Sequence, residues 1–337
     1  MKDVSLARGQ CELWIERAYS RLGLPFSIGA AIVGFLPFLV GIIAIGTTFG
    51  FAAATTGDIR FLPGAFIWIM YCQLAARFSS RRIQSIAKYA ESMSKDESHV
   101  ALPLLCGLKG TLVVWIPLLS VTTVLFGYSA VGTSASLTLD VLISRIVWVY
   151  PVLFNSLYMW TLAYSMFKIY QIGKIELMLR SFAEDRSLGL KPFAVESFRL
   201  TLVYVGFVTI IVLFSAPQGF STLPFLIFYL GLFLFGIVLF LLPLWSLHDR
   251  LVRFKNHNLR AIGQRYALLL KEFEENSETR LEGTLASSLI AIDKVQRDIH
   301  QIRTWPFDAG IVAKLAAIMV SVIAILLSRI VALWLNI

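Results

Sequence analysis

The chain has 337 residues, of which 57% are hydrophobic and only 15% carry a charged side chain, against roughly 25% charged residues in soluble domains. This composition excludes an ordinary soluble protein and indicates an integral membrane protein of the all-α class. The formal net charge of +9 is explained by cations that border the membrane, where anionic lipid headgroups attract them. No compact basic module or aromatic platform predicts nucleic-acid binding.

The N-terminal residues 1–27 contain neither a continuous apolar run nor a small-residue cleavage site, so we expect an uncleaved cytoplasmic segment. Beyond it, apolar runs long enough to cross about 30 Å of hydrocarbon recur along the chain. The second run is short, with 16 residues between Arg60 and Arg77, and a re-entrant segment is its alternative. We predict seven transmembrane helices, at residues 28–53, 61–76, 108–126, 141–167, 200–216, 225–247 and 310–335.

The distribution of cations predicts the topology. With seven spans and a cytoplasmic N-terminus, 26 of the 30 Lys and Arg residues fall in cytoplasmic segments, which is the asymmetry that the positive-inside rule expects. Removing the second span would place the six cations that follow it on the outer side. We therefore predict a multi-pass protein of the cell membrane, with the N-terminus cytoplasmic and the C-terminus extracytoplasmic.

Spans two, four and six should continue as helices beyond the membrane, and the seventh helix should begin in the cytoplasm. Apolar residues recur every three or four positions after each of the three spans, the spacing of one buried helix face. These extensions should pack together as a cytoplasmic helical bundle. The predicted parts are an N-terminal segment (1–27), a six-span bundle (28–247) with cytoplasmic extensions (77–107 and 168–199), a cytoplasmic hairpin (248–304) and a terminal transmembrane helix (305–337).

The predicted hairpin has a bend and a packing seam. Thr279 and Glu282 form a T-x-x-E capping box that would start its second helix. Pro306 lacks a backbone N–H group and disfavours helix at Trp305, so the cytoplasmic helix should end near Arg303, before the last span. The seam has nearly the heptad spacing of a coiled coil and consists of Leu285, Leu289, Ile292, Val295, Ile299 and Ile302.

Signals for enzymatic chemistry are nearly absent. All 21 acidic residues lie outside the apolar cores or at their edges, so no pair of carboxylates is placed within a span. The four histidines share no metal-ligand spacing, and the three cysteines are too far apart to indicate a disulfide framework or a metal cluster. We therefore expect no enzymatic activity, no cofactor and no bound metal.

The last span carries a polar and small stripe. Lys314, Ser321 and Ser328 recur every seven residues with Ala317 and Ala324 between them, so the five side chains share one side of the helix. Copies of such a helix around an axis would line a narrow pore with hydroxyl groups and apolar constrictions. The alternative is a small-residue packing face with Lys314 snorkelling to the inner interface.

A second candidate site lies in the fourth span. Arg145 is a charged residue near the outer end of this span, and Trp148, Tyr150 and Asn155 follow it. Charged residues inside spans are functional candidates by default. The four residues predict either the rim of an outward-facing ligand pocket or a membrane anchor in which Arg145 pairs with Asp140.

The layout as a whole resembles the seven-transmembrane ion-channel superfamily of insect odorant and gustatory receptors, which has remote prokaryotic relatives. The likeness lies in the seven spans, the cytoplasmic extensions of helices two, four and six, and the split seventh helix, and it covers the entire chain. It implies a homotetramer held together by its cytoplasmic helices, with the seventh helix lining a central cation-permeable pore. Carried over by position, Lys314, Ser321 and Ser328 would face this pore, and a ligand pocket would open outward among spans two, three, four and six.

These observations favour an oligomeric ion channel that is gated by an unidentified ligand or otherwise regulated. Its partners would be further copies of itself and the lipid bilayer. Two alternatives stay open. The long basic hairpin suits a seven-span receptor that acts through a cytoplasmic partner. A secondary transporter is less favoured, because the spans contain no internal repeat and no buried acid for ion coupling.

Overall fold

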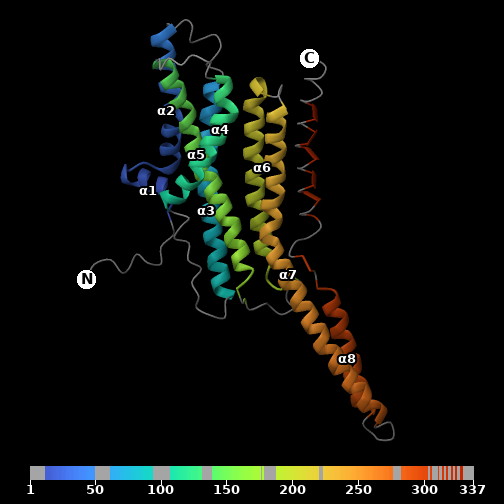
Figure 1. The fold of residues 1–337 in the computed structure, drawn as a ribbon. Coiled ribbons are helices and arrows are strands. Elements are labelled where there is room, and N and C mark those ends of the chain that lie inside the picture. The colour runs from blue at the N-terminus through green and yellow to red at the C-terminus, as the bar shows by residue number, and fades with distance from the viewer. Residues whose placement is uncertain are drawn as a thin grey trace, which may run out of the picture.

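The computed structural model is helical in the part of the chain that it describes. The described residues are 12–49, 61–93, 107–130, 139–175, 177, 187–219, 223–275, 282–302, 304–305 and eleven residues between 310 and 328. They form eight helices, namely α1 (Trp14–Arg21), α2 (Phe26–Phe49), α3 (Phe61–Met93), α4 (Leu108–Ala130), α5 (Leu139–Ile172), α6 (Lys191–Gly219), α7 (Leu223–Glu275) and α8 (Glu282–His300). Helices α2 to α7 lie along one another as a bundle, from which the lower half of α7 projects together with α8 (Figure 1).

Several helices have the length and composition of membrane spans. Among the described residues, Lys191–Val212 in α6 and Leu230–Glu272 in α7 are long and apolar enough to cross a membrane. A third candidate results if α1 and the first part of α2, which are bent by 99° relative to each other, count as one span. The prediction of an all-α fold is thus confirmed for the described residues, and two or three of their helices are candidate membrane spans.

The extension of the second predicted span is present, whereas that of the fourth is short. Helix α3 runs unbroken for 33 residues, roughly 50 Å at 1.5 Å per residue, so residues 61–76 form no re-entrant loop. The prediction that the fourth span continues far into residues 168–199 was wrong, because α5 ends at Ile172. Arg250 of α7 donates hydrogen bonds to the carbonyl groups of Ile175 and Leu177 after this end, which fixes the chain in a turn.

Helix α7 joins the bundle to the hairpin without a break. It has 53 residues, roughly 80 Å, so the predicted boundary at residue 248 lies inside a continuous helix. Helix α8 packs back against α7. Of the predicted seam, Ile299 and Ile302 are buried and Leu289 and Ile292 are half-buried, but Val295 is 48% exposed, because only the α7 side of α8 is covered.

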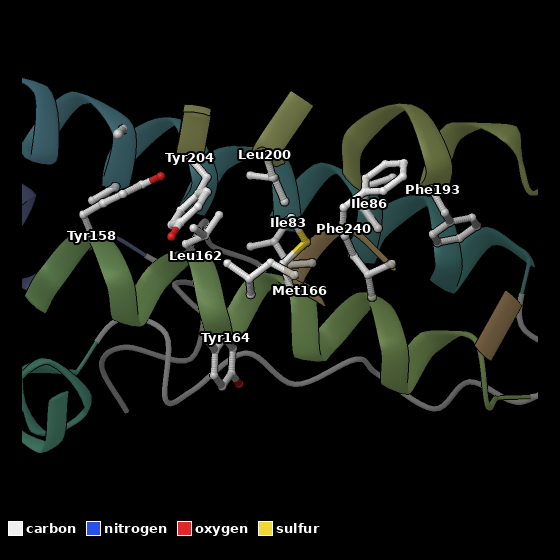
Figure 2. Packing of buried hydrophobic residues seen from close by; sticks show 14 of the residues in the cluster. Ile83, Ile86, Tyr158, Leu162, Tyr164, Met166, Phe193, Leu200, Tyr204 and Phe240 are labelled. Carbon is white, nitrogen blue, oxygen red and sulfur yellow. The ribbon is translucent and has the colours of Figure 1, made fainter. Parts of the chain in front are cut away.

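The core lies where α3, α5, α6 and α7 meet. Tyr158, Leu162 and Met166 follow one side of α5 and are directed at α3 and α6, whereas Tyr164 lies on the opposite side (Figure 2). The ring of Phe207 from α6 lies 5.1 Å from that of Tyr158, measured between centroids. In a membrane, where lipid tails are as apolar as these side chains, such a bundle would depend on close packing rather than on removal of apolar surface from water.

Glycine permits the closest helix approaches. A Cβ atom at Gly206 of α6 would collide with the hydroxyl of Tyr71 from α3, and one at Gly110 of α4 would collide with the indole of Trp160 from α5. Small residues serve this purpose at helix contacts in lipid. The Tyr71 hydroxyl donates a hydrogen bond of 2.6 Å to the Val203 carbonyl on α6, which ties α3 to α6 at this point.

The structure also contains a helix that was not predicted. Helix α1 lies within the segment taken to be without a span, and its Ile15 and Tyr19 are buried against the bundle. The carboxylate of Glu16 accepts a hydrogen bond of 3.2 Å from the backbone N–H of Leu13, which satisfies one donor at the start of the helix. The sequence signal that could have predicted α1 is the spacing of three to four residues between its apolar positions.

Candidate functional site

The five residues predicted to line a pore lie on the terminal segment, residues 310–328, and all five are exposed: Lys314, Ala317, Ser321, Ala324 and Ser328. The apolar residues described in this segment are exposed as well, since Val320, Ile323 and Leu327 are 65%, 40% and 55% exposed. Figure 1 shows the segment standing beside the bundle, separate from α6 and α7. Every described residue of the terminal segment is therefore exposed within one copy of the chain.

The terminal segment is anchored at its base by a clamp on α7, formed by His248 and Lys255. The imidazole of His248 stacks on the indole of Trp305, with ring centroids 4.1 Å apart and an interplanar angle of 19°. Its Nδ1 lies 2.8 Å from the Thr304 carbonyl oxygen, and because a carbonyl only accepts, Nδ1 carries the proton in this contact. The Nζ of Lys255 donates to the carbonyl groups of His300 and Ile302 at 2.7 and 3.2 Å.

This clamp confirms the predicted break before the last span. Helix α8 ends at His300, three residues earlier than predicted, and Thr304 and Trp305 are not helical. The carbonyl groups at a helix C-terminus lack intrahelical partners, and the Lys255 ammonium satisfies two carbonyls in this stretch. His248 and Lys255 thus connect α7 to the stretch from His300 to Trp305.

Trp305→Ala should loosen this connection. Loss of the ring stack removes about 0.5–1.5 kcal/mol of aromatic contact, so amide hydrogen exchange should become faster in peptides that span residues 300–310. Trp245→Ala is the matched control, because Trp245 only meets His248 edge-on, with centroids 6.5 Å apart. Equal exchange in both variants would show that Trp305 does not hold the break.

Of the four residues predicted to form a ligand pocket, the structure describes the side chains of Tyr150 and Asn155. Arg145 and Trp148 lie in α5, and their side chains are outside the described residues. The Tyr150 hydroxyl donates a hydrogen bond of 2.9 Å to the Val33 carbonyl of α2, so Tyr150 joins two helices. Asn155 is 5% exposed, and its Oδ1 has no hydrogen-bond partner among the described residues.

A second buried polar group lies one turn from Asn155. The hydroxyl of Tyr158 is fully buried and also has no hydrogen-bond partner in the described part of the chain. Residues three apart lie on the same side of a helix, so both groups are presented to the interior of the bundle, where the ring of Tyr71 lies 6.5 Å from that of Tyr158. Unpaired buried polar atoms are uncommon and costly, and buried water molecules commonly satisfy such groups.

Tyr158→Phe and Tyr204→Phe should have different effects on stability. The Tyr204 hydroxyl donates a hydrogen bond of 2.6 Å to the Leu232 carbonyl, so its removal should lower the free energy of unfolding by about 1 kcal/mol. Removing the unpaired Tyr158 hydroxyl should be neutral or stabilising, because no bond is lost. Unfolding midpoints of the two variants in detergent measure the difference, and a larger loss for Tyr158→Phe would reveal a partner for its hydroxyl.

Sequence reasoning missed Tyr158, and also Gln73, which is fully buried in α3. The Tyr19 hydroxyl donates to the Gln73 side-chain oxygen, and the Gln73 amide reaches the Ala30 carbonyl of α2 at 3.4 Å. Burial raises the pKa of Tyr19, so this hydroxyl stays protonated and keeps donating. A glutamine within an apolar run was the signal, since polar side chains in spans link helices.

The described residues contain no group of three or more His, Cys, Asp or Glu side chains that could hold a metal ion. No known protein family matches the chain, and no curated protein or solved structure is significantly similar to it. The class is therefore described by the fold and the site alone: a helical protein with apolar helices that suit a membrane, one helix pair that projects from its bundle, and a terminal segment whose described residues are exposed.

Proposed function

We propose that the chain is a seven-span protein of the cell membrane, with a cytoplasmic N-terminus and an extracytoplasmic C-terminus, and that four copies assemble into a regulated ion channel. The terminal helix of each copy lines the central pore. One observation carries this proposal: every described residue of segment 310–328 is exposed in the single chain, including the polar and small stripe from Lys314 to Ser328.

Lipid alone accounts for only part of this exposure. Valine, isoleucine and leucine side chains need no protein partner in hydrocarbon, and a helix satisfies its own backbone groups. The hydroxyl of Ser321 bonds to the Ala317 carbonyl at 2.9 Å, but polar and charged side chains within a span usually face a protein interior or a water-filled cavity. A stripe of serine, alanine and lysine on one side of the helix is better accommodated by a water-filled lumen between copies.

The clamp at the base of the terminal helix supports regulation of this pore. Helix α7 is continuous from the bundle to the tip of the hairpin, and His248 couples it to Trp305. A ligand bound near Asn155 and Tyr158 of α5, a helix that contacts α7, would reposition α7 and with it the lining helix. The hairpin would hold the copies together while the membrane helices move.

Conductance and stoichiometry test the proposal together. Purified protein in liposomes loaded with potassium should release the ion when an ionophore compensates the charge, and native mass spectrometry should give four times the chain mass. Protein-free liposomes and liposomes with heat-denatured protein are the controls. A monomer without any flux would overturn the proposal.

A receptor that acts through a cytoplasmic partner is the second candidate, and the hairpin favours it. Leu268 of α7 and Ile290 of α8 are both 68% exposed on helices that project from the bundle (Figure 1). Exposed apolar side chains beyond the membrane suit a protein contact. If the protein is a receptor, it should be a monomer or dimer, and a pull-down should recover a signalling protein in equal amount. If it is a channel, Leu268 and Ile290 should contact other copies of the chain.

A further inference from the structure

A cavity of about 170 Å³ lies between α1 and α3, away from the proposed pore and from Asn155. Its lining combines charges of both signs with two aromatic rings, those of Tyr19 and Phe26. The charged residues are Glu12, Glu16, Arg77 and Arg81. The volume is below the roughly 300–1,000 Å³ of pockets that enclose drug-sized ligands. The cavity therefore suits a small polar fragment.

The position of the cavity coincides with the end of the apolar parts of two helices. Helix α2 begins at Phe26, and in α3 the buried Ala76 is followed by Arg77, the first charged residue of that helix. Helix α1 lies across this end, because it is bent by 99° relative to α2. With α2 and α3 inserted in a membrane, the cavity lies at the level of the lipid headgroups on the cytoplasmic side, where aromatic and basic residues gather.

The charges in the cavity are only partly paired with each other. The Nε of Arg77 lies 2.8 Å from one oxygen of Glu16, and its guanidinium carbon lies 4.3 Å from the centre of the Phe26 ring, so Arg77 is held in place. The Nη2 of Arg81 is 3.8 Å from the same oxygen, and the Arg81 side chain is 63% exposed. Two guanidinium groups therefore lie near one carboxylate oxygen, and the Arg81 group stays accessible to a further acceptor.

Glu12 lies at the rim of the cavity and carries a negative charge, opposite to the charges of Arg77 and Arg81. It is exposed and has no hydrogen bond or ion pair within the described residues. A pocket with two arginines and two glutamates has no net charge, so it favours a ligand that itself carries one positive and one negative group. Arginine matches phosphate oxygens with paired donors, and a carboxylate accepts hydrogen bonds from a primary ammonium group.

We propose that this cavity binds the headgroup of a phospholipid that carries both a phosphodiester and a primary amine, with Arg81 and Arg77 holding the phosphate and Glu12 the ammonium. The acyl chains run along the apolar surface next to the cavity, where Leu22 is 71% exposed and Ile28 is 51% exposed. The bound lipid fixes α1 against α3. The site requires membrane insertion of α2 and α3 but no conducting pore, so its failure and the failure of the channel proposal are distinguishable.

Native mass spectrometry of the delipidated full chain tests the site with three probes of identical acyl chains: phosphatidylethanolamine, phosphatidylglycerol and phosphatidylcholine. The wild type should bind one phosphatidylethanolamine at least tenfold more tightly than the other two. Arg81→Gln should weaken this binding about tenfold, the effect of one charge-assisted hydrogen bond, and Arg81→Lys less. Glu12→Gln should make the affinities for phosphatidylethanolamine and phosphatidylglycerol equal.

Lys88→Gln is the matched control, since it removes an exposed cation from α3 outside the cavity and should bind lipid as the wild type does. Unfolding midpoints of all variants should agree before lipid is added, because the changed side chains are exposed. Equal affinity of the wild type and Arg81→Gln, or of the three lipids for the wild type, would overturn the proposal. Displacement of the lipid by an equal concentration of soluble glycerophosphoethanolamine would overturn the assignment to a lipid and indicate a soluble phosphodiester.

Discussion

Ser321→Cys should make ion flux sensitive to a positively charged methanethiosulfonate, with nearly complete loss of conductance after the reagent is added. Ser321 lies at the centre of the stripe that would face the pore, and its side chain is exposed. Four bulky cations at one level of a narrow pore would block it sterically and would repel permeant cations. Potassium efflux from liposomes before and after the reagent measures the effect.

The matched control is Ile323→Cys in the same helix. At 100° per residue, Ile323 lies about 200° around the helix from Ser321, and it is also exposed, so its thiol should be placed away from the lumen and leave the flux unchanged. The wild type with the reagent reports on its own cysteines, of which Cys72 is buried. Equal inhibition at both positions would contradict the pore assignment, because the two sides of the helix would then be equivalent.

Most of the helices could be predicted from the sequence because they rest on local signals, and α1 was the exception. Apolar runs located α2 to α7, and the Trp305–Pro306 pair located the break after α8, since proline acts on the residue before it without help from tertiary contacts. The end of α5 was missed although Gly173 marks it. The helical spacing of Ile169, Ile172 and Ile175 suggested continuation, whereas a Cβ atom at Gly173 would collide with the Ser246 hydroxyl of α7.

The candidate sites were less predictable, because they depend on contacts between distant residues. Lys314, Ser321 and Ser328 could be assigned to one side by counting along a helix, but their exposure depends on whether the rest of the chain covers them. The cavity beside α1 joins residues about sixty positions apart, and no spacing rule connects Glu16 with Arg77. Seven membrane crossings and a fourfold assembly stay predictions.

Phe207→Ala should be the most destabilising single substitution in the bundle. The Phe207 side chain is fully buried in α6, between the rings of Tyr158 and Tyr204, with centroid distances of 5.1 and 6.4 Å. Truncation of such a side chain leaves a cavity and costs about 3–5 kcal/mol in soluble proteins. In a membrane the dispersion part of this loss remains, because the lost neighbours are protein atoms at close packing.

Phe167→Ala provides the comparison, since Phe167 of α5 is 49% exposed and its side chain borders the surroundings of the bundle. Its free energy of unfolding should change by less than about 0.5 kcal/mol, the usual range for surface sites. Titration of the full chain with a denaturing detergent measures both variants, and the midpoint should fall strongly only for Phe207→Ala. Equal midpoints would mean that α6 does not pack against α5 through Phe207. A ligand at Asn155 and Tyr158 would then also lack this contact as a route to the neighbouring helices.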